Sequence, residues 1–143
     1  MISKTKLIKH LENDIYCRVG VSELHGVGVI AIKDIGKGIN PFKNLSHEKE
    51  KIITLTENDL KNVDNNVKKV MTDFFGTGNS NTYDVLCYGP NYLNISYYLN
   101  HSTKPNLDLV EGKSEYYEFV TNKEIKKGEE LLINYKLYDD IKK

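Results

Sequence analysis

The sequence predicts a mainly β domain with short helices, and three observations lead to that prediction. Short runs of branched and aromatic residues, the types that strands favour, recur along most of the chain. Turn-forming residues separate these runs from one another. A polar, lysine-rich segment with helical spacing interrupts them at residues 46–75. At 143 residues the chain has the size of one ordinary domain, so we expect a single domain over residues 1–143.

The stretch from residue 15 to residue 42 predicts an antiparallel hairpin followed by a turn. Its two β-rich runs, 15–21 and 27–32, are separated by a short polar segment in which Gly26 or Gly28 can supply a positive φ. A Gly-Lys-Gly triplet then turns the chain. Pro41 indicates an edge or the end of a strand, because proline has no N–H for a sheet.

Residues 46–75 predict a helical insertion. Apolar residues recur there at spacings of three and four, which is typical of an amphipathic helix preceded by a looser charged segment. These residues are Leu60, Val63, Val67, Val70, Met71 and Phe74. Glycines and asparagines between residues 76 and 81 end the helix in a loop.

The second half of the chain returns to short strands. We expect them at 82–88, 92–99, 107–110, 116–121 and 130–135, with a turn at 124–128 and a charged tail.

The composition argues against several kinds of function. Twenty basic and twenty acidic residues cancel, so we expect no direct binding to nucleic acid or membranes. Cys17 and Cys87 are the only cysteines and the four histidines lack ligand spacing, so we predict no metal site and a reducing compartment. No apolar run forms a secretory signal or reaches the roughly 20 residues of a membrane span. We therefore expect an intracellular protein, nuclear or cytoplasmic.

Taken one at a time, the candidate chemical motifs are weak. The Gly26–Gly28 segment is more typical of a tight turn than of a dinucleotide loop, because no helix follows it. His101 and Ser102 are neighbours in an extended segment, where adjacent side chains point to opposite faces, so they do not predict a nucleophilic pair.

The order of the motifs along the chain is more specific than any one of them. His25-Gly26-Val27-Gly28 comes first, Asn-His-Ser-Thr-Lys-Pro-Asn follows at 100–106, and Gly-Glu-Glu-Leu leads to a tyrosine over 128–135. Together they resemble the SET-domain family of protein-lysine methyltransferases over about residues 15–138. The resemblance implies a SET-domain fold of several small curved sheets, with a C-terminal pseudoknot in which the last strand passes under the Asn-His-Ser segment.

The resemblance also implies a cofactor, S-adenosylmethionine, with S-adenosylhomocysteine as the product and no metal in the transfer. Tyr135 matches the catalytic tyrosine that lines the methyl-transfer pore. The residues that match cofactor-binding positions are His25, Gly26, Val27, Gly28, Asn100, His101 and Tyr135, with Tyr98 as pocket wall or core. Tyr83 and Tyr138 are candidates for the substrate channel, although Tyr138 is out of register with many members, so the degree of methylation stays open.

The chain departs from many histone methyltransferases at Thr103, where those enzymes have a cysteine. No cysteine follows Cys87, so we expect no zinc module of the kind that follows the SET domain in those enzymes. The cysteine cluster that precedes it there does not fit before residue 15 either. The lysine channel must then be closed by residues 136–143 or by a second protomer. The chain is similar in length to free-standing viral and bacterial SET proteins, and we expect a homodimer.

These features predict a protein-lysine N-methyltransferase that modifies histone H3 or another basic protein, and so a chromatin regulator. Acidic residues that could receive a basic tail, or only form a solvated face, are Glu111, Glu115, Glu118, Asp139 and Asp140. The alternative is a catalytically silent SET-like module that binds a peptide or cofactor. The presence of Tyr135, Asn100 and His101 together argues against it.

Overall fold

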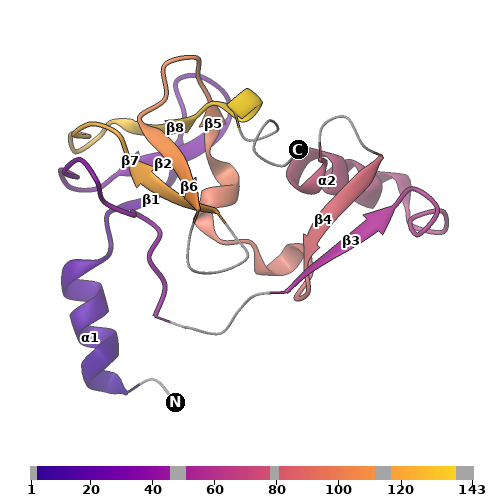
Figure 1. Ribbon diagram of the computed structural model, residues 1–143, viewed down its shortest axis with the longest axis horizontal. Coiled ribbons are helices and arrows are strands. Elements are labelled where there is room, and N and C mark those ends of the chain that lie inside the picture. Colours follow the sequence, from indigo (N-terminus) through magenta and orange to yellow (C-terminus); the bar gives the residue numbers. More distant parts are fainter. Residues whose placement is uncertain (1–2, 46–50, 78–80, 112–116, 138–143) are drawn as a thin grey trace. The chain divides into compact units, whose positions relative to one another are not determined.

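The computed structural model describes residues 3–45, 51–77, 81–111 and 117–137. The chain divides into two compact units (Figure 1). One comprises Met1–Lys49 with Tyr98–Tyr135, and the other comprises Glu50–Tyr97 with Lys136–Lys143. Short strands in small sheets make up most of the regular structure in these ranges, so the predicted fold class, mainly β with short helices, is confirmed.

The first unit is built on a four-stranded sheet in the order β1-β2-β8-β5. Strands β1 (Cys17–Val21) and β2 (Val27–Ala31) form the predicted hairpin, and Val21 lies opposite Val27 at its turn. Strand β8 (Glu130–Ile133) pairs antiparallel with β2 and parallel with β5 (Asn100–His101). Because β8 lies between them, the motifs near residues 25, 100 and 130 converge on one sheet (Figure 1).

The first unit also contains a two-stranded hairpin and two similar turns. Strands β6 (Leu107–Glu111) and β7 (Tyr117–Thr121) form an antiparallel hairpin close to the predicted ranges. Ile35 and Ile125 exchange two backbone hydrogen bonds and are fully buried. Each lies in a Lys-acid-Ile-x-Lys-Gly segment whose glycine, Gly38 or Gly128, has a positive φ. The chain thus contains two similar turns, and these turns pair with each other.

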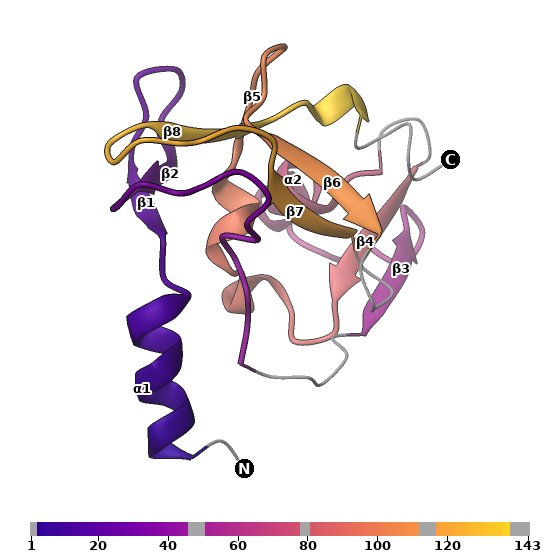
Figure 2. The ribbon, with the colours of Figure 1, turned by 60° about the vertical axis from the view of Figure 1, so that its left-hand side comes forward.

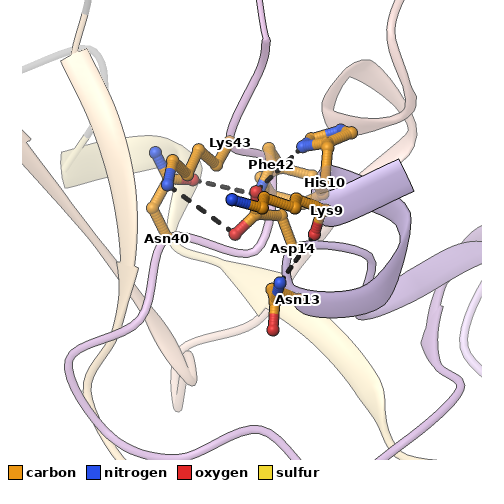
Figure 3. Close-up of polar contacts among 7 residues, drawn as sticks. All are labelled: Lys9, His10, Asn13, Asp14, Asn40, Phe42 and Lys43. Atoms are coloured by element: carbon orange, nitrogen blue, oxygen red, sulfur yellow. Dashed lines mark hydrogen bonds and ion pairs between the residues drawn. The ribbon is translucent and has the colours of Figure 1, made fainter. Parts of the chain in front are cut away.

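Helix α1 (Lys4–Asn13), which the sequence patterns did not predict, precedes β1 and extends away from the four-stranded sheet (Figure 2). Asp14 joins the C-terminal end of this helix to the segment after β2, because its carboxylate contacts His10 Nδ1 at 2.9 Å and Lys43 Nζ at 3.7 Å (Figure 3). None of the helix residues is buried. No helix in the described ranges is long and apolar enough to cross a membrane.

The second unit contains the predicted helix and a strand that was not expected. Helix α2 (Asn65–Phe75) begins at the Asp64 cap, so Leu60 and Val63 lie in the turns before it. The core of this unit contains Leu60, Met71, Phe75, Tyr83 and Val85. The charged segment before the helix was expected to be irregular, but part of it forms strand β3 (Ile52–Thr56), which pairs with β4 (Thr82–Leu86).

The strand predicted at 92–99 is wrong. Two short 3₁₀ helices, η1 (Pro90–Tyr92) and η2 (Ile95–Tyr98), fill most of that range. The Asn94 carboxamide oxygen accepts a hydrogen bond from Ser96 N at 2.9 Å, and this local turn competes with extended backbone. Pro41 lies in a turn rather than in a strand, and β8 ends at Ile133, two residues before the predicted end.

Candidate functional site

The residues predicted from the three motifs meet on the four-stranded sheet of the first unit. The turn before β2 carries His25 and Gly26, and β2 itself begins with Val27 and Gly28. Strand β5 consists of Asn100 and His101, and Tyr135 follows β8 by two residues. A parallel pairing of β5 with β8 and an antiparallel pairing of β2 with β8 bring these segments side by side.

Asn100 connects the segments through its carboxamide. Its Nδ2 donates to the carbonyl oxygens of His25 at 3.2 Å and Val27 at 2.9 Å, and to Glu130 Oε1 at 3.1 Å. Two amide hydrogens serve these acceptors, so at least one is shared. The Asn100 side chain therefore ties the hairpin turn to the last strand.

The turn that presents these carbonyl groups is fixed from within. Ser22 is buried, and its Oγ accepts hydrogen bonds from Leu24 N at 3.0 Å and His25 N at 3.1 Å. Its own backbone N–H donates to Gly26 O at 2.9 Å. Such a side-chain cap holds a short turn in one conformation, so the His25 and Val27 carbonyl groups are held ready for Asn100.

The two glycines of the turn are required for different reasons. Gly26 has a φ of +52°, where residues with a side chain are strained, and open space surrounds its missing Cβ. Gly28 has no positive φ, but a Cβ there would lie 1.9 Å from Glu130 Oε1 and 3.1 Å from Asn100 Nδ2. Gly26 therefore serves the backbone of the turn, whereas Gly28 leaves room for the side chain of Glu130.

His101 and Tyr135 form a second group beside Asn100. The backbone N–H of Tyr135 donates to His101 Nδ1 at 3.0 Å, so Nδ1 is an acceptor and the proton of the neutral ring is on Nε2. The two rings contact each other with centroids 5.2 Å apart. His101 is exposed, which leaves its Nε2–H able to donate to a ligand.

The hydroxyl of Tyr135 is held by Leu99, the residue before β5. It donates to the carbonyl oxygen of Leu99 at 2.5 Å, and the residue is 45% exposed. Burial, and then the negative charge of Glu130, raise the pKa of this hydroxyl above its usual range. Tyr135 is therefore a neutral phenol near neutral pH.

The remaining predicted residues are outside this group. Tyr98 ends η2 and is half-buried, so its assignments as pocket wall and as core both stay open. Tyr83 belongs to the second unit, where it is buried in the core and donates its hydroxyl hydrogen to the carboxylate of Glu57. Tyr138 lies outside the described residues.

Glu130 is the site residue that the sequence patterns did not assign. It is the second glutamate of the Gly-Glu-Glu-Leu motif, and its position beside Gly28 became apparent only with the register between β2 and β8. The described residues include no group of three or more His, Cys, Asp or Glu side chains suited to a metal ion.

Comparisons with known proteins agree with these motifs. Residues 26–136 match a protein-family model described as the SET domain. A Plasmodium falciparum protein described as a candidate histone methyltransferase is 21% identical, with a TM-score of 0.49, over 85% of this chain and 93% of that one. No curated protein matches the chain in sequence.

A second solved structure is similar in fold. It is a humanized mutant of the Chaetomium thermophilum Polycomb Repressive Complex 2 bound to an inhibitor, 21% identical with a TM-score of 0.51. The match covers 85% of this chain but only 15% of that one. At this identity the likeness concerns the fold.

Proposed function

This chain belongs to the SET domain family, since that family's model matches residues 26–136, and we propose from this premise that it is a protein-lysine N-methyltransferase. The observation that carries the proposal is the Asn100 carboxamide, which joins the hairpin turn to β8 beside His101 and Tyr135. Three motifs far apart in the sequence therefore contribute to one exposed site.

The chemistry of this site fits S-adenosylmethionine, a ligand with a positive sulfonium, an amino-acid end and an adenine ring. The carbonyl oxygens of His25 and Val27 and the carboxylate of Glu130 supply acceptors, and His101 Nε2 supplies a donor. The cofactor would be held by the segment 25–28, Asn100 and His101, with Tyr98 as a wall. When bound, it supplies an electrophilic methyl group.

The substrate lysine must lose its proton before it can accept a methyl group. Its reference pKa of about 10.4 makes the neutral amine cost about 4 kcal/mol near pH 7.5. An apolar channel and a neighbouring positive charge both lower the pKa of a lysine. A dedicated general base is therefore not required.

Tyr135 suits a role in which it keeps its proton. Its raised pKa keeps the hydroxyl protonated near neutral pH, so no phenolate is available as a base, and its O–H is already donated to Leu99 O. The lone pairs of its oxygen can accept weak hydrogen bonds from a polarised methyl group, and its ring face attracts a cationic amine. We assign Tyr135 as the catalytic residue that lines the methyl-transfer pore.

We propose a basic protein, histone H3 among the candidates, as the substrate. Glu111 and Glu118 are exposed at the end of the β6–β7 hairpin and could attract a lysine-rich tail. Glu115, Asp139 and Asp140 lie outside the described residues. The Tyr83 hydroxyl donates to the Glu57 carboxylate. A channel role for Tyr83 therefore requires either that this hydrogen bond break or that the ring, rather than the hydroxyl, contact the substrate.

Incubation of the protein with labelled S-adenosylmethionine and core histones tests the proposal. Mass spectrometry then identifies the modified lysine. We expect methylated lysine with the wild-type protein. In Tyr135→Phe, turnover should fall by more than about tenfold, while the cofactor dissociation constant measured by calorimetry stays within about twofold. Tyr16→Phe is a control, because Tyr16 lies in the first unit but contacts Lys33 rather than the site.

The silent-module alternative makes a different prediction for the same experiment. Cofactor binding without transfer to histones or to any protein of a cell extract would support the silent module and overturn the enzyme. Equal losses of turnover and cofactor affinity in Tyr135→Phe would leave an enzyme but contradict the pore role of Tyr135.

A further inference from the structure

Glu130 places a negative charge in the site without a positive partner in the described part of the chain. The residue is half-buried on β8, opposite Ile30 of β2. Its carboxylate accepts a hydrogen bond from Asn100 Nδ2. None of the ion pairs among the described residues involves it. Since a partly desolvated carboxylate is stabilised by a nearby positive charge, the site favours a cationic ligand.

The sheet makes specific room for this carboxylate. Glu130 Oε1 occupies the volume next to the α-carbon of Gly28, where a Cβ would approach it to 1.9 Å. Any larger residue at position 28 would push the carboxylate away. The absence of a side chain at Gly28 therefore sets the position of the charge.

Glu130 also restricts the orientation of Asn100. The three groups that surround Asn100 Nδ2 are two carbonyl oxygens and one carboxylate oxygen, and none of them can donate a hydrogen bond. Flipping the carboxamide would bring its Oδ1 against all three acceptors. The amide nitrogen therefore faces the turn and β8, and Oδ1 faces away, where it can accept a hydrogen bond from a ligand.

We propose that Glu130 supplies the countercharge for a cationic group of the ligand that binds at this site. The inference rests on the proposed function for the identity of the ligand. S-adenosylmethionine carries two such groups, its sulfonium and its α-ammonium, whereas S-adenosylhomocysteine keeps the ammonium and has a neutral sulfur. The carboxylate attracts either group through charge and holds Asn100 ready to accept from an N–H donor.

Calorimetric binding of both compounds to Glu130→Gln tests this proposal. Glutamine keeps the size and an acceptor oxygen but removes the charge, so we expect S-adenosylmethionine to bind about tenfold more weakly. Glu129→Gln is the matched control, because Glu129 is the exposed neighbour of Glu130. The affinity of this variant for S-adenosylmethionine should change less than about twofold. A parallel loss for S-adenosylhomocysteine would identify the ammonium as the cation, and no loss for it would identify the sulfonium.

Two outcomes would overturn the inference and can be told apart. Wild-type affinity of Glu130→Gln for S-adenosylmethionine would remove the role of Glu130 and leave the proposed function intact. A wild-type protein that binds neither compound would overturn the proposed function and this inference with it.

A readout without any ligand checks the position of the charge. Burial raises the pKa of Tyr135 most, and the Glu130 carboxylate raises it further. Glu130→Gln should therefore lower that pKa, and Glu129→Gln should leave it unchanged, in an NMR titration of labelled tyrosine. Gly28→Ala should displace the carboxylate and weaken S-adenosylmethionine binding as Glu130→Gln does. An unchanged Tyr135 titration in Glu130→Gln would contradict the geometry on which the proposal depends.

Discussion

Cys17 and Cys87 have the same side chain but different surroundings. Cys17 is 6% exposed on β1, and burial raises the pKa of its thiol to about 12. Cys87 is exposed. Since the thiolate is the form that reacts with alkylating reagents and binds metal ions, Cys17 is chemically inert in the folded protein.

We predict that iodoacetamide labels Cys87 and leaves Cys17 unmodified in the folded protein. The ordinary pKa of the thiol is 9.0, and in the folded protein it is about 12. The neutral thiol therefore stabilises the folded state fully below pH 9.0, and this contribution is lost as the pH rises toward about 12. Mass spectrometry of the alkylated peptides near pH 8 measures the pattern. Denatured protein should be labelled at both residues, and rapid labelling of Cys17 before unfolding would contradict its burial.

The sequence predicted most residues of the candidate site but not how each of them is held. The order of the motifs predicted Gly26, Gly28, Asn100, His101 and Tyr135, and the structure brings the segments that carry these residues together at one sheet. The positive φ could have been at either glycine, and the backbone places it at Gly26. Glu130 could not be assigned, because its proximity to Gly28 depends on the register between β2 and β8, which local patterns do not determine.

At the scale of elements, predictions succeeded where turns and strand-forming residues agreed. The β1–β2 and β6–β7 hairpins have both signals and formed close to the predicted residues. Strand β3, Ile-Ile-Thr-Leu-Thr, was missed although its residues favour strands, because the charged segment around it indicated irregular structure. Most of its residues are exposed, so it has no buried alternation. The aromatic residues of 92–99 favoured a strand, but the turn at Asn94 decided the backbone.

Asn106 stabilises the last strand from the side of β5. It is buried, and its Nδ2 donates to Glu130 O at 2.8 Å while its Oδ1 accepts from Leu132 N at 2.7 Å. Its backbone N–H also donates to Leu132 O at 3.2 Å. One asparagine thus pairs with β8 much as a short strand would.

We predict that Asn106→Ala lowers the free energy of unfolding by about 2–4 kcal/mol, because it leaves buried backbone groups of β8 unpaired. Urea denaturation measures the loss. Asn106→Asp keeps the size and one acceptor but replaces the donor with a charge facing Glu130 O, so it should destabilise at least as much. Asn91→Ala, at an exposed position, should change stability by less than about 0.5 kcal/mol, and an equally small loss at Asn106 would contradict its role.

At the scale of the whole molecule, the arrangement of the site depends on pairing between distant parts of the chain. Strand β8 lies between β2 and β5, and the parallel pairing of β5 with β8 joins residues near 100 to residues near 132. Propensity and periodicity carry no information about such pairings, whereas the family resemblance predicted that these segments meet. The C-terminal pseudoknot stays a prediction, as does closure of the lysine channel.

The closure of that channel leads to a prediction about oligomeric state. Thr103 lies where many histone methyltransferases of the family have a cysteine, and the sequence contains no cysteine beyond Cys17 and Cys87. Cys17 is a buried, neutral thiol and is therefore a poor metal ligand. Residues 1–143 therefore do not supply the cysteines of a zinc module, and we propose that residues 136–143 or a second copy of the chain complete the channel.

We predict a homodimer, with the second protomer covering the open side of the channel. Light scattering at micromolar concentration should give twice the mass of one chain, and the specific methyl-transfer activity should fall on dilution below the dissociation constant, because mass action separates the protomers. Cofactor affinity should change less than activity, since the residues proposed to hold the cofactor all come from one chain. A monomer whose specific activity is independent of concentration would overturn the dimer.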